Sequence, residues 1–153
     1  MTDSPRDRIP GYLAALSVFG GGWAAFARHV VRSGTPLPAR YAVTDLLLGG
    51  VATHKFARLI SKEGVTTPLR APFTEFQGVA GSAEVNEKVR EGHPLHTVGE
   101  LLTCPFCLAP WISSAYVAGL VVAPGIARTW AAVFTVVGGA DMLQHVYAQV
   151  RAD

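Results

Sequence analysis

Four long stretches of the chain are almost free of charged residues, and polar segments separate them. They cover residues 9–27, 41–54, 101–127 and 129–150. The second and fourth contain one acid each, Asp45 and Asp141. A membrane-spanning helix needs about 20 mostly apolar residues, and the second stretch reaches this length when its helix continues to residue 60. We therefore predict spanning helices at residues 9–27, 41–60, 105–123 and 129–149; three spans plus a re-entrant or surface helix is the alternative.

Proline and glycine mark the boundaries between these stretches. Residues 33–38 contain two prolines and a glycine, which end a helix between the first and second stretches. Pro124 and Gly125 form a tight turn between the third and fourth. A short connection makes consecutive helices antiparallel neighbours, so we expect the last two helices to pack together.

The one long polar segment covers residues 61–99. Its first part, residues 66–73, has too many prolines for a helix. Its second part, residues 83–91, is compatible with a short helix that Ser82 caps and Gly92 ends. The predicted fold is therefore all-α: a single membrane domain over residues 1–153, a bundle of about four helices with one loop.

Composition supports a membrane protein. Charged residues make up only 16% of the chain, against about 25% in average soluble domains, and mean hydropathy is +0.30. These values argue against a disordered chain, a coiled coil and a small disulfide scaffold. The formal net charge is only +2, so nucleic acid is a poor candidate partner. We predict the lipid bilayer as partner, with a second copy or another membrane protein as further candidates.

Basic residues near the ends of the predicted helices indicate an orientation. The side with both termini and the polar loop has nine: Arg6, Arg8, Lys55, Arg58, Lys62, Arg70, Lys88, Arg90 and Arg151. The other side has four: Arg28, Arg32, Arg40 and Arg128. Because basic residues concentrate on the cytoplasmic side, we predict cytoplasmic termini and a cytoplasmic loop. The alternative for the first stretch is a signal peptide cleaved after residues 25–27.

Several polar and thiol side chains fall within the predicted helices. A rise of 1.5 Å per residue places six near the cytoplasmic leaflet: His54, Lys55, Cys104, Cys107, Asp141 and His145. Ionisable residues inside a membrane are costly and usually face a bundle interior. We predict such an interior from Asp45, His54, Lys55, Arg58 and Asp141. In it, Asp141 pairs with Lys55 or Arg58; a polar or metal pocket at the inner leaflet is the alternative.

Glycine clusters fall at one depth in three of the predicted helices. They are residues 20–22, 49–50 and 138–139. Glycine lets helix backbones approach closely in lipid. One prediction is that the three helices meet at this depth; the alternative is that glycine is simply common in spanning helices.

The two cysteines form the motif Cys104-Pro105-Phe106-Cys107. Residues 97–100 match a capping box, which predicts a short helix from Val98. Because a residue before proline rarely continues a helix, Cys104 is expected as the N-cap of a new helix, with Cys107 in its first turn. Free amides and the helix dipole at that position favour a thiolate.

Three hypotheses remain for this motif. The first is a helix start with two buried thiols. The second is thiol redox catalysis by Cys104 and Cys107; the motif is locally similar to a glutaredoxin site, but no sheet follows it. Membrane thiol oxidases of the quinone-coupled kind carry a second cysteine pair, which this chain lacks. The third is a zinc or iron site completed by His54, His145 or Asp141, or by a second copy of the chain in a homodimer; otherwise we expect no cofactor.

Three segments together resemble one bacterial family. They are residues 52–60, 65–74 and 99–108, and residues 141–144 continue the likeness. The resemblance is to domain-of-unknown-function family 1360 (DUF1360), which includes a sporulation-associated membrane protein. It implies a multi-pass protein of a bacterial cytoplasmic membrane and carries over no activity. It also implies a shared pattern of His54, Lys55, Arg58, Arg70, Cys104, Cys107 and Asp141.

Two classes of function follow from these observations. The first is a non-enzymatic scaffold or accessory protein, in which polar residues hold helices to each other or to a partner. The alternative is a thiol- or metal-dependent membrane activity centred on Cys104 and Cys107. The sequence favours the first class and does not identify a substrate.

Overall fold

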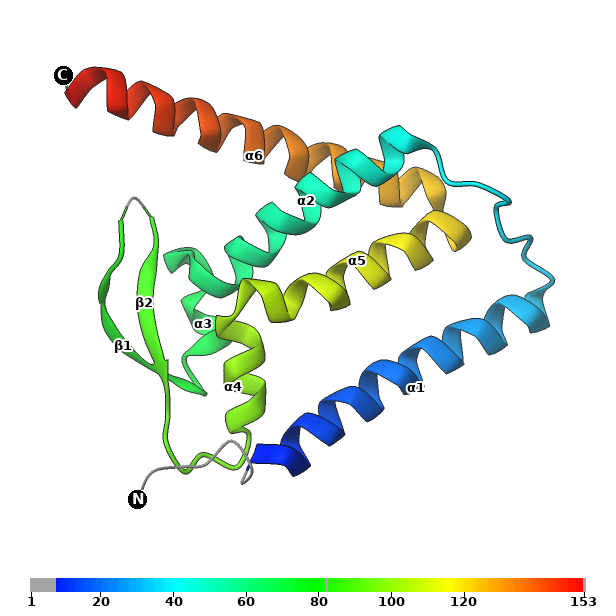
Figure 1. Ribbon diagram of the computed structural model, residues 1–153, viewed down its shortest axis with the longest axis horizontal. Coiled ribbons are helices and arrows are strands. Elements are labelled where there is room, and N and C mark those ends of the chain that lie inside the picture. The colour runs from blue at the N-terminus through cyan, green and yellow to red at the C-terminus, as the bar shows by residue number, and fades with distance from the viewer. Residues whose placement is uncertain (1–7, 82, 153) are drawn as a thin grey trace.

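The computed structural model describes residues 8–81 and 83–152, and these are mostly helical (Figure 1). The elements in chain order are α1 (Ile9–Ser33), α2 (Val43–Lys62), the 3₁₀ turn η2 (Gly64–Thr66), α3 (Thr67–Arg70), β1 (Thr74–Val79), β2 (Val85–Val89), α4 (His96–Thr103), α5 (Pro105–Val122) and α6 (Pro124–Ala152). We call residues 63–103 the cap. The cap lies where α2 ends and α5 begins, which we call the cap end of the bundle (Figure 1).

Each predicted long helix overlaps one of α1, α2, α5 and α6, although α1 continues to Ser33 and α6 already begins at Pro124. Three of the described helices, α1, α5 and α6, are long and apolar enough to cross a membrane. The helix α2 has 20 residues but does not reach that apolarity. Of the residues used to predict orientation, Arg6 lies outside the described ranges.

The centre of the bundle is formed by α2, α5 and α6. Its buried cluster comprises Ala52, Tyr116, Leu120, Ala127 and Ala131. Ala52 and Ala131 are 0% and 1% exposed, so small side chains lie where these helices approach most closely. The two helices α5 and α6 are neighbours as predicted, but the turn predicted at Pro124 and Gly125 is wrong: only Ala123 separates the helices, and both residues belong to the first turn of α6.

The first helix lies along one edge of the molecule, apart from the other three (Figure 1). Its contacts with α5 are aromatic and polar. The rings of Phe19 and Trp111 meet edge to face at 5.1 Å, and the Trp23 indole N–H donates to the Ser114 hydroxyl at 3.3 Å. The helix α1 is therefore attached through a few large side chains.

The glycine prediction is confirmed for two helices and wrong for the third. A Cβ on Gly49 would collide with the Tyr116 ring of α5, and one on Gly138 would contact Val51 and Lys55 of α2 at 3.6 Å. A Cβ on any of residues 20–22 would meet nothing within 4 Å. Residues 20–22 therefore do not bring α1 close to another helix; its glycine at a close approach is Gly11, where a Cβ would collide with Thr97 of α4.

The helix predicted at residues 83–91 is wrong, because this segment belongs to a β-hairpin. The strands β1 and β2 pair antiparallel, from Thr74 opposite Val89 to Val79 opposite Val85. Burial alternates along β2, where Val85, Glu87 and Val89 are half-buried and the residues between them are exposed; this is the period of a strand. A bulge between Phe76 and Gly78 shifts the register. Ser82, the predicted N-cap residue of that helix, lies outside the described residues.

Two smaller predictions for the cap are also corrected. Residues 66–73 do contain helix, since Pro68 lies in the first turn of α3, where its missing N–H costs no intrahelical bond. The helix α4 starts at His96, and no side chain forms a hydrogen bond that caps its N-terminus. An amide of its first turn bonds to the backbone instead: the Val98 N–H donates to the Leu95 carbonyl at 3.0 Å. The fold is thus a helical bundle with a small cap that contains a two-stranded sheet and short helices.

Candidate functional site

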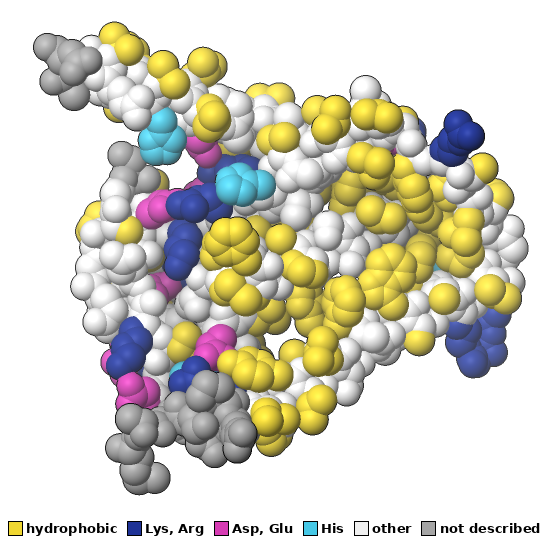
Figure 2. All heavy atoms as spheres, in the orientation of Figure 1, with side chains coloured by type: hydrophobic (Ala, Val, Ile, Leu, Met, Phe, Trp, Pro, Cys, Tyr) yellow, Lys and Arg dark blue, Asp and Glu magenta, His cyan; other side chains and the backbone are white. Residues whose placement is uncertain are grey.

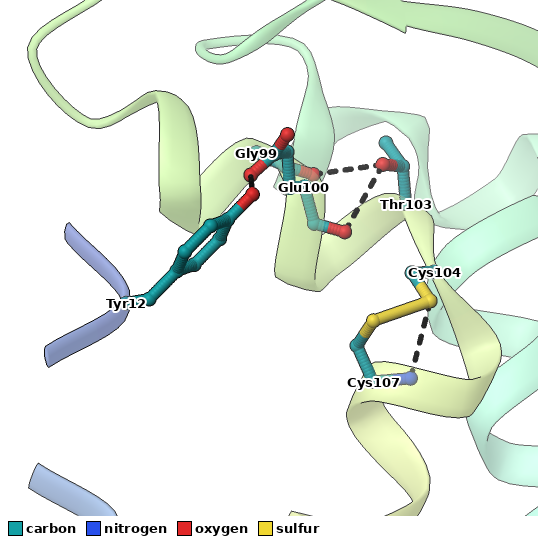
Figure 3. The surroundings of a disulfide bond; sticks show 6 residues. All are labelled: Tyr12, Gly99, Glu100, Thr103, Cys104 and Cys107. Atoms are coloured by element: carbon teal, nitrogen blue, oxygen red, sulfur yellow. Dashed lines mark hydrogen bonds between the residues drawn. A yellow bond between two sulfur atoms is a disulfide. The ribbon is translucent and has the colours of Figure 1, made fainter. Parts of the chain in front are cut away.

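The cysteine motif lies at the junction between the cap and the bundle. Cys104 is the single residue between α4 and α5, and its extended backbone (φ −109°, ψ 107°) turns the chain from one helix into the other. Its Sγ accepts a hydrogen bond from the Cys107 backbone N–H at 3.2 Å (Figure 3). The predicted N-cap is therefore confirmed, with Pro105 at the first helical position.

Cys104 and Cys107 are joined in a disulfide, with their Cα atoms 5.2 Å apart (Figure 3). Cys104 is half-buried, whereas Cys107 is exposed. A thiolate that attacks this bond would therefore reach Cys107 first and release the Cys104 sulfur as a thiolate. That sulfur already accepts an amide hydrogen bond at the start of an 18-residue helix, which stabilises a negative charge.

Next to the disulfide, Glu100 attaches α1 to α4. One carboxylate oxygen accepts from the Tyr12 hydroxyl at 2.9 Å (Figure 3), and the other pairs with the Arg8 guanidinium. The His96 ring lies 3.4 Å from the same carboxylate. This contact holds the first turns of α1 against the helix that precedes the disulfide, and no pattern of spacing in the sequence pointed to it.

Lys55 links α2 to α6 and to the cap. Its ammonium lies 2.6 Å from the Asp141 carboxylate and also pairs with Glu63. The Lys55 side chain is only 11% exposed. The predicted pairing of Asp141 with Lys55 is confirmed, whereas Arg58 pairs with Glu84 in the cap at 2.6 Å.

Asp45 forms the matching link at the other end of the bundle. The Arg128 guanidinium of α6 binds its carboxylate through two nitrogens, at 3.0 and 2.8 Å. The Tyr116 hydroxyl of α5 donates to the Asp45 backbone carbonyl at 2.8 Å. The sequence predicts a polar interior that includes Asp45 but does not indicate Arg128 as its partner, because Arg128 lies 83 positions away and contributes there only to the count of basic residues at helix ends.

The five candidate metal ligands are not gathered at one point. Cys104 and Cys107 are in the disulfide and Asp141 pairs with Lys55. His54 and His145 are exposed side chains. Within residues 8–81 and 83–152, no group of three or more His, Cys, Asp or Glu side chains is placed to hold a metal ion.

Arg70 is fully buried in the cap, with 0% of its surface exposed. Its guanidinium pairs with Glu87 of β2 and donates to the Glu63 carbonyl at 3.0 Å and the Thr66 hydroxyl at 2.7 Å. It also donates to the carbonyl of Ile60 near the end of α2. One side chain thus satisfies backbone acceptors at a helix C-terminus, where cations are favoured.

Charged side chains gather towards the cap end of the face in Figure 2, and hydrophobic side chains cover much of the rest of that face. An exposed pair in the cap is Lys88 and Glu91, 2.7 Å apart. The hydrogen bond that the Lys88 ammonium donates to the Glu91 carboxylate raises the pKa of Lys88. At 62% and 76% exposure this pair is open to solvent, so it adds little to stability.

A family model described as "Protein of unknown function (DUF1360)" matches residues 47–147. The matched segment includes the disulfide, the Lys55–Asp141 pair and the buried Arg70. It leaves out α1 and Asp45. No curated protein and no solved structure matches the chain.

Proposed function

Because this chain belongs to the DUF1360 family, a family of unknown function, we propose a function from its geometry: a four-pass integral membrane protein that acts as a non-enzymatic scaffold or accessory protein. One observation carries this proposal. Charged residues in and beside the long helices are engaged in ion pairs between separate elements. These are Lys55–Asp141, Asp45–Arg128, Arg58–Glu84, Arg70–Glu87 and Arg8–Glu100.

The course of the chain supports four passes. The helices α1, α2, α5 and α6 alternate in direction, and the cap connects α2 to α5 at one end (Figure 1). The 20 residues of α2 extend about 30 Å, which matches the hydrocarbon thickness of a bilayer. The distribution of basic residues favours a cytoplasmic cap.

The ion pairs also explain how α2 crosses a membrane despite its charges. Asp45 and Lys55 each lower the mean hydropathy of α2, but each forms an ion pair with a residue of α6. A paired charge costs less to bury than an isolated one. We infer that α2 is a span that depends on α6.

Single-cysteine labelling tests the topology. In the Cys104→Ser/Cys107→Ser background, Asn86→Cys places a thiol in the hairpin and Thr35→Cys places one between α1 and α2. A membrane-impermeant maleimide added to intact cells should label position 35 and not position 86, and inverted vesicles should give the reverse. Labelling of both positions from one side would contradict four passes.

A second candidate function is thiol–disulfide exchange at Cys104 and Cys107. The observation that favours it is the exposed Cys107 sulfur bonded to a Cys104 sulfur held by a helix N-terminus. A substrate thiolate would attack Cys107, the disulfide bond would break, and its electron pair would go to Cys104. A second substrate thiol would then lose its proton and displace Cys107, leaving an oxidised substrate and two thiols.

The reduction potential distinguishes the two functions. The purified full chain is equilibrated in glutathione buffers and its free thiols are counted, with metal content measured on the same samples. A potential below about −300 mV is typical of structural disulfides, and one between about −120 and −270 mV is typical of exchange catalysts. We expect the structural value. A value in the catalytic range, with a cellular defect in Cys107→Ser, would replace the scaffold proposal.

A further inference from the structure

Exposed positive charge without a partner is concentrated at the end of the bundle opposite the cap. Arg28 and Arg32 are exposed on α1, four residues apart and so on one face of the helix, and Arg40 is exposed in the connection to α2. None of the three forms a hydrogen bond or an ion pair with a residue that the structure describes. Figure 2 shows Lys and Arg side chains at this end, apart from the charged side chains near the cap.

The protein has no acidic residue at this end to neutralise these arginines. Residues 9–62 contain one acid, Asp45, and residues 101–140 contain none. Asp45 is already bound by two nitrogens of Arg128. Several basic residues at the cap end do pair with carboxylates of α6 and of the cap. The end opposite the cap therefore presents guanidinium groups whose counter-ion must come from outside the chain.

The two arginines of α1 lie at the depth of lipid head groups when α1 crosses a bilayer. Arg28 is 19 positions after Ile9, the first residue of α1, which corresponds to about 28 Å of helix. The hydrocarbon core of a bilayer is about 30 Å thick, so Arg28 lies at its edge and Arg32 one turn beyond it. The rings of Trp23 and Phe26 come just before them and contact each other at 5.6 Å, and tryptophan is typical of this boundary.

We propose that Arg28 and Arg32 together bind the phosphate group of an anionic phospholipid in the leaflet away from the cap. The proposal rests on the proposed four-pass topology. A guanidinium binds phosphate oxygens through two parallel N–H bonds, which gives both charge and geometry. A zwitterionic head group brings its own ammonium, which two adjacent guanidinium groups repel. Arg40 adds positive charge on the same side of the membrane, so the site prefers lipids with a net negative charge.

This lipid gives α1 a contact at the end where the protein provides none. At the cap end, the Tyr12 hydroxyl of α1 donates to Glu100 of α4. At the opposite end, the Ser33 hydroxyl bonds to the Val30 carbonyl and to the Thr35 hydroxyl, which are both close in sequence. The helix is thus fixed to the cap at one end and to a lipid phosphate at the other.

Photolabelling of the full chain in phosphatidylcholine nanodiscs tests the site. The probes are phosphatidylglycerol and phosphatidylcholine with a diazirine at the same position of one acyl chain, used in equal amounts, and labelled peptides are identified by mass spectrometry. We expect phosphatidylglycerol to label residues 23–33 at least about five-fold more strongly, the factor for roughly one basic residue near a membrane surface. About 1 M salt should reduce this preference, because it screens charges beyond about 3 Å.

Charge variants show which residues cause the preference. Arg28→Gln/Arg32→Gln should be labelled equally by both probes, with an unchanged melting temperature because neither side chain has a partner in the protein. Arg28→Lys/Arg32→Lys should keep part of the preference, since the charge remains and the paired N–H bonds are lost. Lys62→Gln/Arg151→Gln is the matched control, because it removes the same charge at the cap end, and it should keep the full preference. An unchanged preference in Arg28→Gln/Arg32→Gln, or an equal loss in the control, would overturn the proposal.

The labelling pattern separates failure of this site from failure of the topology. Equal labelling of residues 9–33 by both probes in the unmodified protein would overturn the lipid site and leave four passes intact. Absence of any label from residues 9–27 would place α1 outside the bilayer and overturn both proposals. Soluble glycerol phosphate, which has the phosphate but no acyl chains, should not reduce labelling. Displacement of the probe by millimolar glycerol phosphate would identify a soluble anion as the ligand and overturn the assignment to a lipid.

Discussion

At the scale of single residues, the buried cation Arg70 lies beside backbone carbonyls that have no hydrogen-bond donor within their own helix. The Arg70 guanidinium reaches carbonyls of Ile60 and Glu63 around the end of α2 and a carboxylate of β2. Glu87, its acidic partner, is 3% exposed. Neither charge has access to water, so each depends on the other for its solvation.

We predict that Arg70→Met unfolds the cap locally. Removing one partner of a buried pair costs about 3–5 kcal/mol, because the other charge stays buried and unpaired. Hydrogen exchange of the amides of residues 74–89 should accelerate strongly in the variant. Lys88→Met is the matched control in the exposed pair, and we expect a change of less than about 0.5 kcal/mol there. Equal exchange in both variants would show that Arg70 does not hold the cap.

A second residue-scale prediction concerns Lys55, whose ammonium has two carboxylate partners. Lys55→Met leaves Glu63 and Asp141 facing each other, whereas Asp141→Asn keeps the Lys55–Glu63 pair. Thermal unfolding in detergent should therefore show a larger loss for Lys55→Met, about 3 kcal/mol, than for Asp141→Asn, about 1 kcal/mol. In the double variant the losses should be less than additive. Additive losses would mean that the two residues do not interact.

The sequence predicted residue roles where the signal is local. Cys104 as N-cap follows from the proline beside it, and Lys55 with Asp141 follows from two charges at similar depth. The Asp45–Arg128 pair joins residues 83 positions apart, and nothing in the sequence around either residue indicates the other as its partner. The enclosure of Arg70 depends on the β-hairpin, where the local sequence predicts a helix instead.

At the scale of elements, long apolar runs predict helices reliably because length alone separates them from strands. The polar segment is different. The residue types at positions 83–91 are compatible with a helix. Residues 85–89 nevertheless pair as β2 with β1, which lies earlier in the chain, and every second residue of β2 is half-buried. The strand pairing with β1, which lies outside this segment, therefore decides its structure, and the helix propensity of the segment alone gives the wrong prediction.

Close approach of α2 and α5 yields a prediction at this scale. Gly49 lies against the Tyr116 ring, and Gly50, the next residue, faces open space. Gly49→Ala should lower stability by about 1–3 kcal/mol through overpacking. Gly50→Ala should be neutral or raise stability by up to about 1 kcal/mol, since helical alanine restricts the unfolded chain. Melting temperatures in detergent check the pair, and a similar loss in both would exclude the Tyr116 contact as the cause.

At the scale of the whole molecule, two ion pairs hold α2 to α6 at two separate levels of the bundle. Asp45–Arg128 lies at the end away from the cap, and Lys55–Asp141 lies towards the cap. On α6, Phe134 lies between the two pairs, and its ring is 4.7 Å from that of Phe56 in α2. This arrangement keeps the two helices in one register along their common length, as polar pairs do in helix bundles.

A charge exchange tests this arrangement. Arg128→Asp places two acids together and should sharply lower the yield of folded, monodisperse protein from membranes, because like charges repel and Asp45 loses its counter-ion. The double variant Asp45→Arg/Arg128→Asp restores an opposite pair at the same place and should recover most of the yield. Failure to recover would mean that Arg128 acts through other contacts, and equal yield in the single variant would mean that the pair is dispensable.

The distance along the chain between Asp45 and Arg128 also imposes an order on biogenesis. A ribosome adds roughly 5–20 residues per second, so the 83 positions between them take roughly 4–17 seconds to synthesise. During that interval α2 has emerged with an acid whose partner does not yet exist. On the proposed topology, α2 therefore enters the bilayer late, together with the α5–α6 hairpin, and a ribosome-stalled chain that ends before α6 should leave α2 accessible to protease.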